Sequence, residues 1–549
     1  MIGNGNGGRR RLSVKTPKSS QYLLGDGGGK TSWCFEASSG FKIIVTCFAV
    51  FTVAVTTALI IEIVYGDPEV VPHGVVSTDN QHCSEIGAEI LKKGGSGVDA
   101  AIAAFFCLCV YQPYSVSPAG GGYMLIHQHG VNGKTTLFNF REVTPSRLTK
   151  EQLKEPGTRR GEGGLWVGTS GLMKGLRQAH EMFGKLQWAD LVTPSVTLAR
   201  YGVPLDRIHA REVLARKDVP SSQLFADFQK SYDLGKHFIN ENLAETLNQL
   251  VIVGPQVFWN GSVGEDIIQS VKRAGGVMEL QDLADYKVEE MAPLEESFWG
   301  HKIVTSGGES AGAGMLSALG SFVAEEFPSL SWSQLIQSLN VALLEVSLSG
   351  DSENKTNPQS KKGDTLIQEL FDLSEPTGSA ISVMAVKEQY VSFVSGLNSL
   401  FGAQVASEKG GFFLNSAMSN FFLFDDSDAP NNFGPTKHPL SFLAPVLAYS
   451  PNRPCYKRLV LGSSDFQASV QVLLHSLYLN ESISDSVEEP RIYIGSDGNI
   501  YGEEGFEYKD LIDLRKKPTP YPSVNLLFKY EDTAKGHSDT RGGGSAYRF

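Results

Sequence analysis

The stretch GGGYMLIHQHGVNGKTTLFNFREV, residues 120–143, decides the fold class of this chain. Two largely apolar runs, YMLIHQ and TTLFNFREV, flank the turn VNGK, so we predict a β-hairpin. The triple glycine at 120–122 lacks the Lys-Ser/Thr pair of a P-loop and the spaced glycines of a dinucleotide site. We therefore interpret it as a place where backbones pack closely.

Two helical patterns precede this hairpin. Residues 83–91, CSEIGAEIL, have apolar positions at helical spacing and stop before a double glycine. Ser96 and Asp99 then resemble a capping box that opens the apolar run AAIAAFFCLCV at 100–110. We predict two helices before the first strand pair.

Strands and a helix follow the hairpin. A strand at 302–305 leads into a helix at 315–327, MLSALGSFVAEEF. The runs SAISVMAV at 379–386 and YVSFVSGL at 390–397 are small, β-branched and apolar, which is typical of a buried sheet. The polar run at 349–364 is predicted to be a loop. The alternation indicates a mixed α+β body.

The N-terminal region indicates a membrane anchor. Residues 1–42 hold seven basic and two acidic side chains and many Gly and Ser, so we predict a disordered cytosolic tail. Residues 43–61, IIVTCFAVFTVAVTTALII, carry no charge and would span about 28 Å as a helix. An acidic flank follows, so we predict an anchor helix over 43–65 in a single-pass type II protein, with the body extracellular or lumenal. A cleaved signal peptide is the weaker alternative, because the basic region is long.

Composition limits the classes of function. The chain has 549 residues and a net charge of −12, which argues against nucleic-acid binding. Its six cysteines exclude a disulfide-dense scaffold. Sequons at Asn260, Asn354 and Asn480 predict glycosylated surface loops on an exported body. The sequence has no ligand spacing typical of a metal site, and we expect no cofactor.

The segment GESAG, residues 308–312, matches the G-x-S-x-G pattern between a predicted strand and a predicted helix. Ser310 is therefore a candidate nucleophile of a serine hydrolase, with His438, His475 or His537 downstream as its possible base. The pattern is frequent by chance in a chain with 58 glycines. A tight strand-to-helix turn is the favoured interpretation.

Longer segments carry a family resemblance. They are GVVSTDNQHCSEIGAEILKKGGSGVDAAIAAFFCLCV at 74–110, PAGGGYMLI at 118–126, FNFREVTP at 138–145, HPLSFLAPV at 438–446 and SDTRGGGSAYRF at 538–549. Together they resemble the gamma-glutamyltransferase (glutathione hydrolase) family, over the chain from about Gly66 to Phe549. The long N-terminal arm and the segment SGLNSLFG look most like the gamma-glutamyltransferase 7 branch.

The resemblance implies an N-terminal-nucleophile (Ntn) hydrolase fold, an αββα sandwich, after a single transmembrane helix. Family members are made as a precursor that cuts itself, and the new N-terminal Thr attacks the gamma-glutamyl carbonyl of glutathione or a related compound. Residues 66–376 would then be the large-subunit-like part and 377–549 the small-subunit-like part, paired after cleavage.

Several family positions are matched. Arg141 matches the Arg that holds the substrate α-carboxylate, a task that suits a guanidinium fork. Asn398 matches an Asn that helps to bind the glutamyl group, and Ser441 matches the first Ser of a Ser-Ser pair. Cys83 and Cys107 match a family disulfide, which an ectodomain would permit.

The nucleophile position is shifted. Counted back from SVMAV without a gap, it falls on Gly378, which has no hydroxyl. A shift of one residue gives Thr377 or Ser379, and we take Thr377 as the candidate.

Other family positions are replaced. Ala417 and Asn420 stand where the family has the Glu and Asp that hold the substrate α-ammonium, and Phe442 replaces the second Ser. Asp465 and Phe466 replace the Gly-Gly whose backbone supports the oxyanion. Two hypotheses follow. The chain is a membrane-anchored gamma-glutamyl hydrolase or transferase of reduced or altered specificity, or it is a pseudoenzyme that acts as a binding partner.

Overall fold

The computed structural model describes residues 39–65, 74–130, 133–206, 210, 213–214, 221–322, 328–350, 370, 377–423, 429–453, 455–495, 497–506 and 514–549. The chain divides into an N-terminal unit, which ends at Glu69, and a body, Val70–Phe549. Each unit is described by itself. The predicted loop at 349–364 lies almost wholly outside the described residues.

The N-terminal unit contains helix α1, Ser39–Tyr65. Its stretch Gly40–Ile61 is long and apolar enough to cross a membrane, and no other helix of the described chain has that property. The hydroxyls of Thr46, Thr52 and Thr57 each donate a hydrogen bond to the carbonyl four residues earlier. The helix therefore satisfies its own polar side chains, as an apolar surrounding requires.

The first sheet of the body has seven strands in the order β18-β1-β7-β8-β2-β3-β4, all antiparallel to their neighbours. Its strands are β1 Val75–Thr78, β2 Gly121–Gln128, β3 Lys134–Asn139, β4 Glu289–Met291, β7 Gly378–Met384, β8 Gln389–Gly396 and β18 Ser545–Arg548. Strands β2 and β3 confirm the predicted hairpin, and β7 and β8 confirm the predicted strand pair.

The second sheet has six antiparallel strands in the order β17-β16-β12-β11-β6-β5. They are β5 Leu294–Phe298, β6 His301–Thr305, β11 Val446–Tyr449, β12 Arg458–Ser463, β16 Val524–Tyr530 and β17 Thr533–Ser538. The smaller pieces are β9 Ala406–Ser407, β10 Phe412–Phe413, β13 Ile492–Ile494, β14 Ile500–Gly502 and β15 Arg515–Lys516.

The two large sheets pack face to face. Buried side chains of both sheets, including Leu125, Val394, Val460 and Leu527, form one apolar cluster between them. Alternate residues of these strands point to the opposite faces, where the helices lie, so both faces of each sheet are buried. This explains why the strands are nearly continuous apolar runs.

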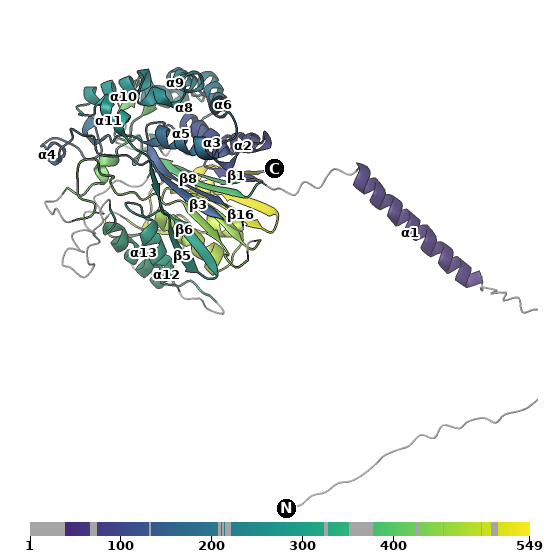
Figure 1. The fold of residues 1–549 in the computed structure, drawn as a ribbon. Coiled ribbons are helices and arrows are strands. Elements are labelled where there is room, and N and C mark those ends of the chain that lie inside the picture. Colours follow the sequence, from purple (N-terminus) through teal and green to yellow (C-terminus); the bar gives the residue numbers. More distant parts are fainter. Residues whose placement is uncertain are drawn as a thin grey trace, which may run out of the picture. The chain divides into compact units, whose positions relative to one another are not determined.

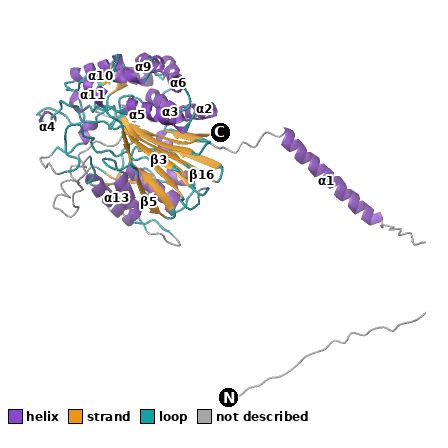
Figure 2. Ribbon diagram, viewed as in Figure 1, coloured by secondary structure: helices purple, strands orange, loops and turns teal. Residues whose placement is uncertain are grey.

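Helices cover the outer face of each sheet, which gives the predicted αββα sandwich (Figures 1 and 2). Over the first sheet and beside it lie α2 Gln81–Lys92, α3 Gly97–Tyr111, α5 Leu172–Phe183, α6 Trp188–Tyr201, α8 Gln223–Asp233, α9 Glu241–Ile252, α10 Ser262–Arg273 and α11 Leu280–Asp285. On the side of the second sheet lie α12 Gly312–Gly320, α13 Trp332–Ser347, α15 Phe466–Leu473 and α16 Ile483–Glu488. The short helix α4 is Lys150–Leu153.

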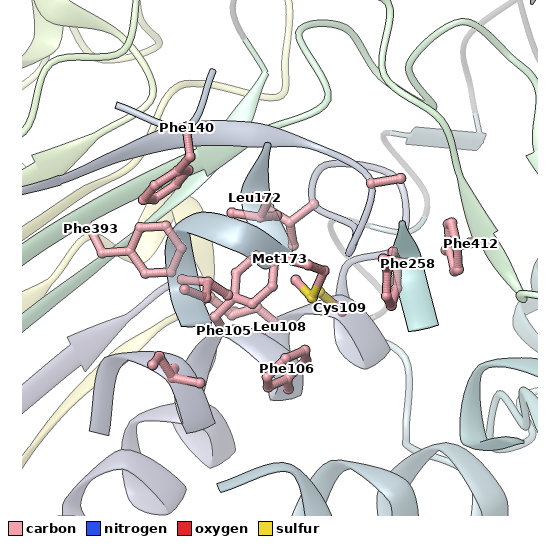
Figure 3. Close-up of a cluster of buried hydrophobic side chains, with 14 of the residues drawn as sticks. Phe105, Phe106, Leu108, Cys109, Phe140, Leu172, Met173, Phe258, Phe393 and Phe412 are labelled. Carbon is pink, nitrogen blue, oxygen red and sulfur yellow. The ribbon is translucent and has the colours of Figure 1, made fainter. Parts of the chain in front are cut away.

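Helix α3 is wholly buried between the first sheet and the outer helices. Figure 3 shows its side chains Phe105, Phe106 and Leu108 among residues of other elements, including Phe393 of β8. Ser96 and Asp99 form the predicted capping box, with both reciprocal hydrogen bonds present.

We predicted a helix over 315–327. In the structure the corresponding helix, α12, begins three residues earlier, at Gly312, and ends at Gly320. Residues 323–327 of that prediction lie outside the described chain.

Cys83 of α2 and Cys107 of α3 are joined by a disulfide with a Cα–Cα distance of 5.3 Å.

Candidate active site

Thr377 lies just before β7, and its half-buried side chain borders two cavities. The first, which we name the Arg141 cavity, has a volume of about 10 Å³ and is lined by Arg141, Thr377, Asn398, Ser441, Phe442 and Leu443. The second, the Lys517 cavity, has a volume of about 110 Å³, and its lining includes Asp79, Asp465, Lys517 and Tyr521. The four residues that the family resemblance singled out as catalytic or substrate-binding, Arg141, Thr377, Asn398 and Ser441, thus line one small cavity.

The backbone explains why a hydroxyl does not stand at position 378. Gly378 of β7 lies opposite Gly396 of β8. A Cβ atom on Gly378 would be 2.6 Å from the Ser395 carbonyl oxygen, closer than real Cβ contacts. The pair of glycines therefore lets the two strands approach closely, and the side chain nearest to this point on the N-terminal side is that of Thr377.

Ser379 faces a different set of groups. Its hydroxyl donates to the carboxylate of Asp79 and lies 3.2 Å from Gln112 Oε1. Asp79 also accepts hydrogen bonds from Ser523 Oγ at 2.8 Å and Asn525 Nδ2 at 2.7 Å. Burial raises the pKa of Asp79 despite these donors. Ser379 therefore belongs to a buried network that fixes the start of β7, a role that the sequence did not reveal.

Arg141 is 1% exposed and follows the end of β3. Its backbone is fixed by Asn139, whose Oδ1 accepts the Arg141 N–H at 2.9 Å, and by the Tyr286 hydroxyl, which donates to the Arg141 carbonyl. Nη1 lies 2.9 Å from Glu142 Oε2, but Nε and Nη2 have no hydrogen-bond partner within the described chain. Burial raises the pKa of the Glu142 carboxyl, although the neighbouring guanidinium opposes this shift.

The side-chain amides of Asn398 and Asn420 are hydrogen-bonded to each other. Asn420 Nδ2 donates to Asn398 Oδ1 at 2.6 Å, and Asn398 Nδ2 donates to Asn420 Oδ1 at 3.1 Å and to Ser419 Oγ at 3.1 Å. Asn420 also donates to the Leu440 carbonyl. Both side chains are buried, and Ala417 is fully buried one turn away. The wall where the family resemblance places two acids is neutral and already hydrogen-bonded.

Ser441 is buried, its N–H donates to the Glu309 carbonyl at 2.8 Å, and its Oγ accepts the Leu443 N–H at 3.2 Å. Phe442 stacks on Phe466, with ring centroids 6.3 Å apart and planes 10° apart. Two phenyl rings thus stand where the family resemblance places a hydroxyl and a glycine.

Side chains at the N-terminus of α15 accept hydrogen bonds from its first backbone N–H groups. The Asp465 N–H donates to Ser463 Oγ at 3.2 Å, and the Asp465 carboxylate accepts the Gln467 N–H at 2.7 Å. Burial raises the pKa of Asp465, and the Lys517 ammonium opposes that shift. Two N–H groups at this helix terminus therefore already have protein acceptors.

Ser310 forms an isolated parallel β-bridge with Ser441, but its own side chain faces away from the two cavities. It is fully buried, its Oγ accepts the Gly312 N–H at 3.2 Å, and it lines neither of the two cavities. His438 instead lies near the backbone of Glu142 and the carboxylate of Glu289. Ser310 therefore belongs to the turn that starts α12, and the arrangement does not favour a serine-hydrolase triad.

The remaining predicted sites are on the surface or outside the description. Asn260 and Asn480 are exposed, whereas Asn354 lies outside the described residues. Within the described ranges, no group of three or more His, Cys, Asp or Glu side chains is arranged to hold a metal ion.

Two stacked antiparallel sheets between helical layers, with a hydroxyl at the start of a central strand, define the Ntn-hydrolase class. A solved cephalosporin acylase from Bacillus halodurans has this fold, with a TM-score of 0.72 and 18% identity over 87% of this chain and 96% of that chain. The model of the gamma-glutamyltranspeptidase family matches residues 83–362 and 324–549.

Curated relatives agree with that match. This chain is 31% identical over 515 residues to glutathione hydrolase 7 of Rattus norvegicus, which covers 85% of this chain and 76% of the relative. It is 27% identical over 530 residues to glutathione hydrolase proenzyme 1 of Schizosaccharomyces pombe, over 85% of this chain and 83% of the relative. The chain belongs to the gamma-glutamyltranspeptidase family.

Proposed function

We propose that this chain is a membrane-anchored gamma-glutamyl hydrolase or transferase whose turnover of glutathione is strongly impaired, with Thr377 as its nucleophile. The observation that carries the proposal is that Thr377 and Arg141 line one cavity, and that two buried nitrogens of Arg141 have no hydrogen-bond partner in the described chain. Relatives named glutathione hydrolase support the substrate class.

The reaction uses the Thr377 hydroxyl twice. It first attacks the carbonyl of the preceding peptide bond, as the word proenzyme in the names of relatives suggests. The peptide C–N bond breaks and frees the Thr377 α-amine, and water then hydrolyses the ester on Oγ, which releases the upstream chain as a carboxylate and restores the hydroxyl. That amine then takes the hydroxyl proton as Thr377 Oγ attacks the substrate amide. A C–O bond forms between Thr377 Oγ and the acyl carbon of the substrate, the amide C–N bond of the substrate breaks, and the proton leaves with the departing amine. Water or an acceptor amine cleaves the resulting ester and restores the hydroxyl.

Two features support impairment. A substrate α-ammonium would meet the neutral Asn398–Asn420 pair, and the loss of a buried charged partner costs about 2–5 kcal/mol, or roughly 30- to 4000-fold in binding. The Asp465 N–H is already bonded to Ser463, and one missing oxyanion donor lowers the rate by about 10²–10³.

The test uses the full-length chain, purified in detergent and treated with a glycosidase. Denaturing electrophoresis and intact mass should show two chains that meet at Thr377, together with slow glutathione hydrolysis. Thr377→Ala should remove both, whereas Thr377→Ser should retain part of each. Activity and cleavage that survive in Thr377→Ala would overturn the assignment. Labelling of Ser310 by a fluorophosphonate probe would favour the serine-hydrolase alternative.

A second candidate is a pseudoenzyme that acts as an uncleaved binding partner. The observation that favours it is the volume of the Arg141 cavity, about 10 Å³, which is room for roughly one water molecule. A single chain near full length, with no glutathione hydrolysis, would establish this candidate and retire the first.

We also propose the predicted topology, with the tail at 1–42 in the cytosol and the body outside it. The apolar surface of α1 supports a span. Glycosidase-sensitive mass at the exposed Asn260 and Asn480 would support an exported body, and protease access to the tail only after permeabilisation would fix the orientation. A tail that is digested in intact cells would contradict it.

A further inference from the structure

A larger cavity, which we name the Lys387 cavity, lies at the other end of the first sheet. It has a volume of about 590 Å³ and is lined by the loop between α2 and α3, the end of α5 and the turn between β7 and β8. The paired residues Gln128 and Gln389 of β2 and β8 also line it. Thr377 instead adjoins Gly396, at the far end of β8. A strand that runs from 389 to 396 is about 23 Å long, so the cavity is separate from the candidate active site.

The charged side chains that line the Lys387 cavity are all positive. They are Lys185, just after α5, and Lys387, in the β7–β8 turn, and both are exposed. Neither has an ion-pair partner within the described chain. The acid of the same turn, Glu388, is paired with Arg458 at 3.0 Å and with Lys529. On a chain of net charge −12, this is a local excess of unpaired positive charge.

Apolar side chains stand beside these lysines. Met182 is 47% exposed and Val386 is 48% exposed, and both line the same cavity. An exposed apolar side chain next to an exposed lysine is typical of a surface that lies at the level of lipid headgroups, where the apolar group leaves water and the ammonium stays in it. The lining therefore fits a ligand that is anionic and borders an apolar phase.

The anchor joins the body at this end of the sheet. Strand β1 begins at Val75, which pairs with Met384 at the end of β7 and with Arg548 of β18. Figure 1 shows the C-terminus beside β1 and α2. Eight residues, 66–73, separate the end of α1 from Gly74, and a chain of that length spans at most about 30 Å. A membrane that α1 spans is therefore within reach of the β7–β8 turn.

We propose that the Lys387 cavity is a docking site for the headgroup of an anionic phospholipid, with Met182 and Val386 at the headgroup level. The proposal rests on the proposed anchoring by α1 but not on the chemistry of Thr377. The volume is in the range of small-molecule sites, and ammonium groups bind a lipid phosphate as point charges. Each lysine close to an anionic surface strengthens binding by about 5-fold.

The test uses the full-length chain in nanodiscs of phosphatidylcholine alone or of phosphatidylcholine mixed with phosphatidylserine. Acetylation by a water-soluble reagent, read by mass spectrometry, measures the access of water to each lysine. We expect Lys185 and Lys387 to react at least about 3-fold more slowly in the mixed discs, and high salt should reverse this. The exposed Lys409, between β9 and β10, is the internal control and should react equally in both.

A pair of double variants tests the cause. The exposed Lys93 directly precedes the lining residue Gly94, so its protection reports on the same contact. Lys185→Gln with Lys387→Gln should abolish the protection of Lys93 in the mixed discs. The matched double variant, Lys230→Gln with Lys409→Gln, should retain it, because it removes the same charge elsewhere. Thermal unfolding confirms that both variants are folded.

The remaining outcomes decide against the proposal. Equal reactivity of Lys185 and Lys387 in both kinds of disc would overturn it, and so would an equal slowing of Lys409. Equal protection by soluble phosphoserine in discs of phosphatidylcholine alone would indicate a site for soluble anions and overturn the membrane assignment. Acetylation does not depend on turnover, so we expect the same protection whether or not the chain cuts itself or hydrolyses glutathione, and the two proposals can fail separately.

Discussion

Position 378 offers a direct test of where the nucleophile lies. The structure predicts that Gly378→Ala destabilises the body, because the new Cβ would lie 2.6 Å from the Ser395 carbonyl oxygen and 3.2 Å from the Gly396 Cα. Both are backbone atoms, so one strand must shift. Overpacking of this kind costs about 1–3 kcal/mol. A β-branched Thr at 378 adds bulk to the same contact.

The expected change in melting temperature follows from the size of the body. With about 480 residues in the unit and about 2.1 cal/mol/K of unfolding entropy per residue, 1–3 kcal/mol lowers Tm by about 1–3 °C. Scanning calorimetry at one fixed scan rate measures this shift. Gly320→Ala at the end of α12 is the matched control, since its Cβ would meet Phe298 Cε1 at an ordinary 3.4 Å.

An exchange of the two residues completes the test. The double variant Thr377→Gly, Gly378→Thr moves the hydroxyl to the position that gapless counting assigns. We expect lower stability than for wild type and no cleavage at 378. A variant with unchanged Tm, or one that cuts itself before the new Thr, would refute the argument that close packing of β7 against β8 displaced the nucleophile.

Three further predictions concern other parts of the body. Replacing Cys83 and Cys107 together by Ser should lower the unfolding free energy by about 3.5 kcal/mol in denaturant titrations, given their sequence separation of 24, and a loss below 1 kcal/mol would contradict this. Burial raises the pKa of Glu142 above its ordinary 4.5, so the folded state keeps a proton that the unfolded state releases. The free energy of unfolding of Glu142→Gln, measured by denaturant titration, should therefore rise relative to that of wild type as pH increases from 4 to 8. Wild-type and variant unfolding free energies that change in parallel with pH would contradict this. The double variant Asp465→Gly, Phe466→Gly should raise glutathione hydrolysis at least 10-fold by freeing backbone donors, unless these donors have no part in the reaction, in which case the rate stays unchanged.

The local patterns predicted much of the fold, because they are set by neighbours in the chain. The hairpin at 120–143, the capping box before α3 and the strand pair at 379–397 each depend on side-chain periodicity or on one turn. The pairing of β1 with both β7 and β18 depends on residues far apart in sequence, and no local pattern gives it.

The candidate site was predictable only position by position. Matching to a family placed Arg141 and Thr377 together, and both line one cavity. The sequence did not indicate that Asp79 would hold the start of β7, since its partners Ser379 and Asn525 come from strands far along the chain. Such a network appears only when the sheets are assembled.

The residues that differ from the expectation of the family resemblance are well packed and hydrogen-bonded in this structure. Asn420 is bonded to Asn398, Phe442 stacks on Phe466, and Asp465 caps its own helix. Each change leaves its neighbours satisfied, which avoids the penalty of about 1–3 kcal/mol for every buried polar group without a partner.

Arg141 differs from those positions, because two of its buried nitrogens stay without a partner in the described chain. A side chain that served stability alone would lose little as Met, since an apolar residue of similar volume often replaces a buried ion pair without cost. A buried guanidinium with two unpaired nitrogens, which lines the same cavity as Thr377, therefore fits the carboxylate-binding role that the proposed function gives to Arg141. Self-cleavage before Thr377 and glutathione hydrolysis separate the two functional hypotheses, whereas carboxylate binding at Arg141 tests the role of that side chain under either of them.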